Sequence, residues 1–156
     1  MGSVRAATLA ITLVLVAGVA VACGVPPGPS VQAEDVWARP ALVSQEGGGM
    51  AGTGAVFMRL VNDGSEADRL VGGQTDAAKI VEIHQTVIED DLARMQMLPN
   101  GVEVPARGEV LLEPGSYHMM LFDLQRDLRV GDTFRIELWF SESDNLAMEV
   151  EVREPE

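Results

Sequence analysis

The chain has few of the side chains that normally carry enzyme chemistry or cross-links. It contains one cysteine, two histidines and a low aromatic content of 4%. The one cysteine, Cys23, has no partner for an internal disulfide. The sequence has no Gly-x-Ser-x-Gly nucleophile turn, and no Lys-Ser or Lys-Thr pair follows the glycine run at 47–49, as a phosphate-binding loop requires. We therefore expect a binding protein rather than an enzyme.

Positive charge is scarce as well. The sequence has 11 Lys and Arg residues against 24 Asp and Glu residues. Only Arg5 precedes residue 23, so the rest of the chain carries a net charge of −14. A surface this acidic is repelled by phosphate backbones, which excludes nucleic acid as a partner. It favours encounters with cations or with basic patches on other proteins, although a generic solvated surface explains the acidity equally well.

The N-terminus has the layout of a secretory signal peptide at 1–22. Arg5 precedes an uncharged apolar stretch at 6–22, which includes the small residues Ala20 and Ala22. A short positive region, an apolar core and a small-residue exit are typical of an export signal that is removed. An uncleaved membrane anchor is the alternative, but the apolar stretch is short for a helix that crosses a bilayer, which needs about 20 residues.

The residues around Cys23 indicate a lipid anchor. The sequence Val-Ala-Val-Ala-Cys-Gly at 19–24 resembles the bacterial lipobox, in which the cysteine is lipidated before cleavage. This implies a mature chain that starts at Cys23 and is held by several acyl chains, on the outer side of the cytoplasmic membrane or in the periplasm. The Gly- and Pro-rich segment at 23–33 predicts an extended tether. A soluble secreted protein with a free thiol is the alternative.

The 134 residues that follow the signal are enough for one domain with a hydrophobic core, which we expect at 34–153. Short apolar or alternating segments separated by Gly, Pro, Asn and Asp predict an all-β sandwich or barrel. The segment at 76–79 is compatible with one helical turn. The expected strands lie at 56–61, 69–72, 79–88, 92–98, 110–112, 117–124, 133–140 and 147–152.

Both histidines have methionines at positions that suit a sheet. His118 and Met120 are two residues apart in an expected strand, so they point to the same face. His84 lies on the more polar face of another expected strand, and an acidic turn allows it to face Met95 across a hairpin. Met97 shares that face with Met95. Imidazoles and thioethers are neutral donors, and a soft thioether favours Cu(I).

These spacings resemble those of the periplasmic copper chaperones of the PCu(A)C type. The resemblance covers roughly residues 34–153 and implies a single cupredoxin-like domain, a β-sandwich or Greek-key barrel, whose Cu(I) ligands fall on His84, Met95, His118 and Met120. It further implies a protein that delivers copper to a respiratory oxidase copper site or to its assembly factor. Besides the four ligand positions, it rests on the segments Val-Trp-Ala-Arg-Pro at 36–40, Asp-Arg-Leu-Val-Gly at 68–72, Val-Pro-Ala at 104–106 and Pro-Gly-Ser-Tyr-His at 114–118.

The chain departs from this family at several positions. Gln85 and Thr86 stand where many relatives have an extra Met or His, and the His- and Met-rich tail of some relatives is absent. Met97 is an alternative ligand to Met95, because both lie on one strand face. Met119 is expected to point away from His118 and to pack in the core.

Other functions were weighed against copper delivery. A blue-copper site needs a cysteine with two histidines, and a catalytic zinc site takes three His, Glu or Cys ligands with water. Neither fits two histidines with methionine neighbours. The alternative from another class is a β-sandwich interaction or assembly lipoprotein without metal, whose His and Met are packing residues. Copper storage or sensing would use the same site as delivery.

Overall fold

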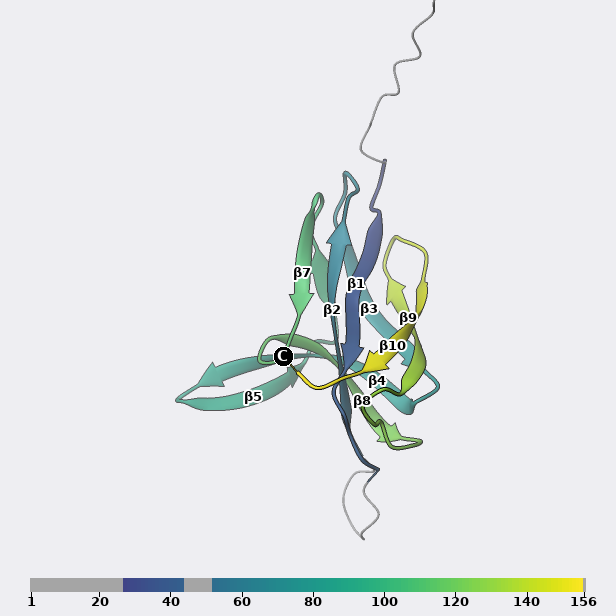
Figure 1. The fold of residues 1–156 in the computed structure, drawn as a ribbon. Coiled ribbons are helices and arrows are strands. Elements are labelled where there is room, and N and C mark those ends of the chain that lie inside the picture. The colour runs from purple at the N-terminus through teal and green to yellow at the C-terminus, as the bar shows by residue number, and fades with distance from the viewer. Residues whose placement is uncertain (1–26, 44–51, 156) are drawn as a thin grey trace, which may run out of the picture.

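The computed structural model describes residues 27–43 and 52–155, and all of its regular structure is β-strand (Figure 1). The predicted signal peptide and the lipidation site at Cys23 lie outside the described residues. The all-β class predicted from the sequence is confirmed. The ten strands are β1 (Val31–Ala38), β2 (Gly54–Asn62), β3 (Asp68–Thr75), β4 (Ala78–Glu89), β5 (Leu92–Met97), β6 (Val102–Val104), β7 (Gly108–Leu112), β8 (Tyr117–Leu124), β9 (Thr133–Phe140) and β10 (Leu146–Val152).

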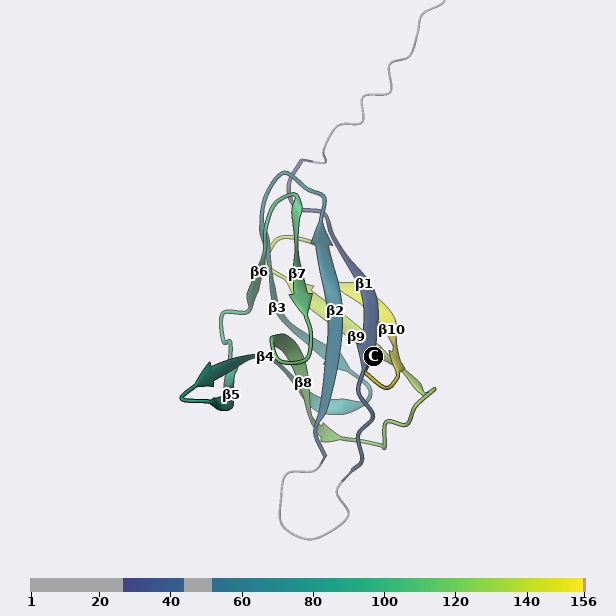
Figure 2. The same cartoon turned by 60° about the vertical axis from the view of Figure 1, so that its left-hand side comes forward.

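The strands form one mixed sheet in the order β5-β4-β8-β7-β2-β1-β10-β9-β3-β6, and β8 also pairs with β2. The β1–β10 and β7–β8 pairs are parallel and the other pairs are antiparallel. Strand β5 lies at one edge of the sheet. The β4–β5 hairpin projects from the body of the domain as an arm, on the left in Figure 1 and in Figure 2.

The core lies between the two halves of this curled sheet. Strand β9 shows the expected alternation, because Phe134, Ile136 and Leu138 are buried while the residues between them are partly or fully exposed. Met119 of β8 reaches across to β3, where a Cβ atom built on Gly73 would lie 3.1 Å from the Met119 Cε atom. The glycine leaves room for this side chain, so the two halves pack face to face as a sandwich.

Two strands were not predicted, and one boundary was wrong. Strand β1 starts at Val31, whose side chain is buried, so residues 31–33 belong to the sheet rather than to the tether that we placed at 23–33. Strand β6 is only three residues long, which is too short for a periodic pattern. The segment at 76–79 is not a helical turn, because Ala78 and Lys79 already pair as the start of β4.

The arm is closed by a two-residue turn. Asp90 and Asp91 join β4 to β5 with φ angles of 51° and 61°. Tight hairpin turns require positive φ, which aspartate tolerates better than most residues. The turn fixes the register of β5 against β4, and therefore fixes which methionine lies beside which residue of β4. In the part of the chain that is described, no helix has the length and apolar character needed to cross a membrane.

Candidate metal centre

Three neighbouring strands place the predicted ligands on one face of the sheet. His84 of β4 is directly opposite His118 of β8 and, on its other side, opposite Met97 of β5. Met120 is opposite Glu82, and this pair lies two residues along the strands from the His84–His118 pair. Directly opposed residues in antiparallel strands point to the same side and lie about 5 Å apart. The sheet therefore gathers both histidines with methionines from β5 and β8.

Three of the four predicted ligands line a pocket beside this row. His118, Met120 and Met95 contribute to a cavity of about 180 Å³, together with Thr86 of β4. The remaining walls come from segments that are distant in sequence, namely 39–41, 53–55, Phe57 and 114–115. His84 is not among the lining residues. Its ring centroid lies 6.1 Å from that of His118, and the two rings are inclined at 39°.

His118 forms the floor of the pocket and is only 3% exposed. Its Nδ1–H donates to the carbonyl oxygen of Ser116 over 3.0 Å. Its other nitrogen, Nε2, is buried and has no hydrogen-bond partner. Most buried polar atoms in proteins are paired, so an unpaired lone pair here is an unusual cost that a bound cation would remove.

His84 has the same incomplete pairing. Its Nε2 atom lies 2.9 Å from the Oε2 atom of Glu82, while its Nδ1 atom is buried and unpartnered. The ring also packs against Phe122 of β8, with centroids 5.8 Å apart. Each histidine therefore has one nitrogen held by the protein and one left without a partner, on neighbouring strands.

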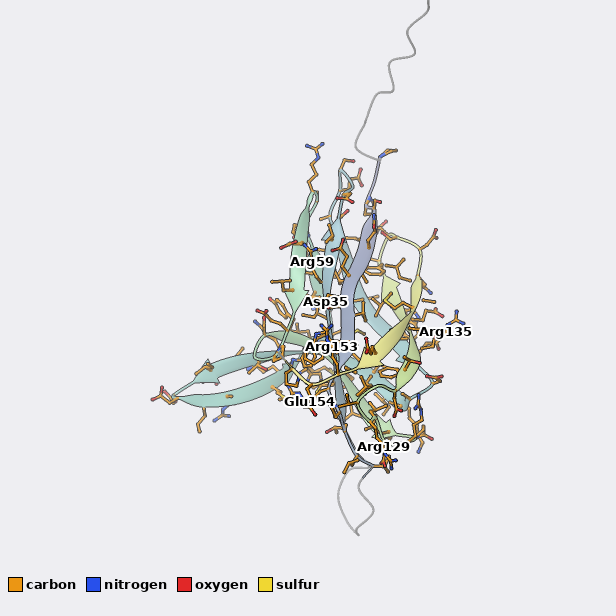
Figure 3. All side chains as sticks on the ribbon, viewed as in Figure 1. Asp35, Arg59, Arg129, Arg135, Arg153 and Glu154 are labelled. Atoms are coloured by element: carbon orange, nitrogen blue, oxygen red, sulfur yellow. The ribbon has the colours of Figure 1, made fainter. Side chains whose placement is uncertain are left out.

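A stacked aromatic pair, with an arginine over each ring, adjoins the pocket at Phe57, whose ring centroid lies 6.4 Å from that of His118. Trp37 and Phe57 have ring centroids 4.7 Å apart. The Arg39 guanidinium lies 5.5 Å from the centre of the Phe57 ring, and that of Arg153 lies 5.2 Å from the Trp37 ring. Arg153 also pairs with Asp35 at 2.6 Å, and Figure 3 shows these two labelled side chains beside strand β1. Stacking of this kind holds Arg39 at the pocket wall.

The surroundings of His118 favour its neutral form by lowering its pKa. Burial lowers the pKa of the His118 ring below its usual range, since it disfavours the charged form. The hydrogen bond to the Ser116 carbonyl opposes this effect, while the charges of His84 and Arg39 add to the lowering of the pKa. A neutral imidazole is the form that binds a metal ion, so the ring is ready to act as a ligand.

The methionines differ in exposure. Met120 is half-buried in the pocket wall, Met95 is 63% exposed and Met97 is 50% exposed. Met119 is fully buried on the opposite face, as predicted. The expected partnership of His84 with Met95 across the hairpin is wrong in register. Met97 is the residue opposite His84, and Met95 is opposite Thr86, two residue pairs further along. Sequence spacing alone could not distinguish these two positions, because Met95 and Met97 lie on the same face of β5.

Most of the chain matches the profile of a known protein family. The profile described as "Putative lipoprotein LpqE-like" matches residues 31–152. The chain belongs to the LpqE-like family. A curated relative, "Putative lipoprotein Lxx21020" of Leifsonia xyli subsp. xyli, is 32% identical over 126 residues, which cover 81% of this chain and 74% of that protein. The match to the family profile begins at residue 31, which is also the first residue of β1.

Solved structures of similar fold include PCuAC domains. The copper-bound PCuAC domain from PmoF2 has a TM-score of 0.60 at 21% identity, and the similarity covers 80% of this chain and 93% of that domain. The Cu(I) form of DR1885 from Deinococcus radiodurans has a TM-score of 0.56 at 29% identity, with 78% of each chain covered. These matches confirm the cupredoxin-like β-sandwich expected for the domain.

In this LpqE-like chain, the candidate donors on this face of the sheet are imidazoles and thioethers. Among the described residues, no three or more His, Cys, Asp or Glu side chains gather as a metal-binding group. An ion held at this face would thus take sulfur ligands beside the imidazoles, and such a set suits a soft, singly charged ion.

Three residues at the site were not predicted. These are Glu82, Arg39 and Phe57; of them only Glu82, which lies two residues from His84 on the same face of β4, could be linked to a histidine from the sequence. Arg39 directly follows β1 and Phe57 lies in β2, and their spacing along the chain does not link them to the histidines. Only the order of strands in the sheet brings them there.

Proposed function

We propose that this chain is an extracytoplasmic lipoprotein that binds one Cu(I) ion through His84, Met95, His118 and Met120 and passes it to an acceptor. The observation that carries the proposal is the pair of buried, unpartnered ring nitrogens, on rings 6.1 Å apart, beside two thioethers. Neutral nitrogen and sulfur donors favour Cu(I) over divalent ions. The copper named for the PmoF2 and DR1885 domains supports this choice of metal.

The interaction-module alternative is less well supported. It required His118 and Met120 to be buried in the core and His84 to lie far from them. His118 is buried, as that alternative required, but His84 is its direct neighbour and Met120 lines a pocket. Packing alone gives no reason for two adjacent histidines to keep one nitrogen each without a partner, because such atoms cost about 1–3 kcal/mol when buried.

The unequal exposure of the ligands suits release. Met95 is on the edge strand β5 and is 63% exposed, whereas His118 is 3% exposed. In the proposed cycle the Met95 thioether is replaced first by an incoming ligand of the acceptor. Met120 and the histidines follow, so the ion is never free in solution. The acceptor is a respiratory oxidase copper site or its assembly factor, and the anchor at Cys23 keeps the domain at the membrane where such an acceptor lies.

The test is a Cu(I) competition titration of the chain without residues 1–22 and with Cys23→Ser, against a colorimetric chelator under reducing conditions. We expect one tightly held Cu(I) per chain. His118→Ala and Met120→Ala should weaken binding at least a hundredfold, while Met119→Leu, on the opposite face, should leave it unchanged. A chain that never competes with the chelator would refute the copper function and favour the interaction module.

A further inference from the structure

Glu82 and His84 lie two residues apart on the same face of β4. The Glu82 Oε2 atom is 2.9 Å from His84 Nε2, and the side chains are 35% and 12% exposed respectively. An ionised carboxylate can only accept a hydrogen bond. In a neutral His84 ring, Nε2 must therefore carry the proton, since a lone pair there would face the negative charge. The remaining lone pair is then on Nδ1, the buried atom without a partner.

The arrangement at His118 is reversed. A carbonyl oxygen also only accepts, so the Ser116 carbonyl requires the proton on His118 Nδ1 and leaves the lone pair on Nε2. The two rings thus offer different nitrogens. At His118 the backbone of the same strand fixes the choice, whereas at His84 it depends on one side chain, that of Glu82.

We propose that Glu82 is a positioning residue of the metal site. Its carboxylate holds His84 in the tautomer and ring orientation that offer Nδ1, so that the metal is bound by His84 Nδ1 and His118 Nε2. The proposal rests on the metal-binding function proposed above and adds a residue to it. Carboxylates that hold the second nitrogen of a ligating histidine orient the ring and raise its basicity.

The surroundings of Glu82 support this role over that of an ordinary surface charge. Within the described residues, no Lys or Arg pairs with Glu82, and its recorded ion-pair partner is His84. Glu82 is directly opposite Met120 of β8, so its carboxylate lies among the proposed metal ligands. A monovalent cation added to a neutral donor set brings an uncompensated charge, which this carboxylate would offset.

The first test needs no metal. The chain has only two histidines, so the ring nitrogens of the metal-free protein can be assigned by ¹⁵N–¹H long-range NMR with one substitution each. The measurement uses the chain without residues 1–22 and with Cys23→Ser. We expect His84 protonated on Nε2 and His118 protonated on Nδ1. His84 protonated on Nδ1, or a mixture of both tautomers, would overturn the proposal.

The second test separates positioning from folding. Glu82→Ala removes the acceptor and should weaken Cu(I) binding by about 10- to 100-fold. Glu82→Gln keeps an oxygen that accepts from Nε2–H, and should restore affinity to within about threefold of the unchanged chain. Glu103→Ala, which removes a carboxylate paired with Arg69 on β3, is the matched control and should have no effect.

Two further results have defined meanings. If Glu82→Ala binds Cu(I) as well as the unchanged chain, the positioning role is wrong. If Glu82→Gln binds as poorly as Glu82→Ala, the charge rather than the acceptor matters, and the tautomer argument is overturned. Should the unchanged chain bind no Cu(I), the proposed function fails, and the tautomer measurement still decides whether Glu82 orients His84.

Discussion

His84 and His118 are direct neighbours across β4 and β8, with ring centroids 6.1 Å apart and one unpartnered buried nitrogen each. The pair costs stability in the metal-free protein, because a buried polar atom without a partner has lost its water and gained nothing in return. Residues that reduce stability in this way commonly belong to functional sites. The cost can be measured directly, since it should disappear when the polar atom is removed.

His118→Leu should stabilise the metal-free chain while abolishing metal binding. The substitution removes the unpartnered Nε2, and the Ser116 carbonyl remains paired because the Thr86 N–H also donates to it over 3.0 Å. A gain of about 1 kcal/mol in unfolding free energy is expected, or about 4 °C in Tm. Thermal unfolding followed by circular dichroism, with and without Cu(I), measures both effects. A lower Tm for the metal-free variant would show that His118 contributes to stability rather than reducing it.

Met119 and Met120 provide a matched pair of substitutions. They are adjacent in β8 but point to opposite faces, Met119 into the core and Met120 into the pocket. Leucine has nearly the volume of methionine but no sulfur, so either change should cost less than about 1.5 kcal/mol of stability. Met120→Leu should weaken Cu(I) binding more than tenfold in a chelator competition, and Met119→Leu should not alter it. Equal effects of the two changes would mean that the pocket thioether is not a ligand.

The pocket selects between the two methionines of β5. Met95 lines the cavity with His118 and Met120, whereas Met97 is opposite His84 and does not line it. We expect Met95→Leu to lower Cu(I) affinity more than tenfold and Met97→Leu to lower it less than threefold. Both side chains are exposed, so neither change should alter folding. X-ray absorption of the Cu(I) complex would supply the sulfur count. The reverse ranking would assign the ligand to Met97.

The sequence predicted the fold better than it predicted the spatial arrangement of the candidate ligands. Strands β8 and β9 were predicted residue for residue, because both are apolar-rich segments bounded by turn residues and β9 also alternates regularly. Strand β1 was missed because its bulge between Glu34 and Trp37 breaks the period of two. The neighbours of His84 depend on strand order and on the turn at 90–91, which are tertiary features. For that reason the pairing with Met97 and the wall formed by Arg39 could not be deduced from spacing.

Acidification should destabilise the metal-free protein through His118. The folded-state pKa of His118 is lowered from the usual 6.5 by burial, so the folded state prefers the neutral ring. The contribution to stability from this preference is fully present above about pH 6.5 and is lost as the pH falls through the lower folded-state pKa. The carboxylates of this acidic chain also titrate in acid, so the useful quantity is the difference in unfolding free energy between the unchanged chain and His118→Leu. Denaturant titrations from pH 7.5 to 5.5 should show the unchanged chain losing stability relative to the variant. A constant difference, or one that changes in the opposite direction, would mean that folding does not lower the pKa of His118.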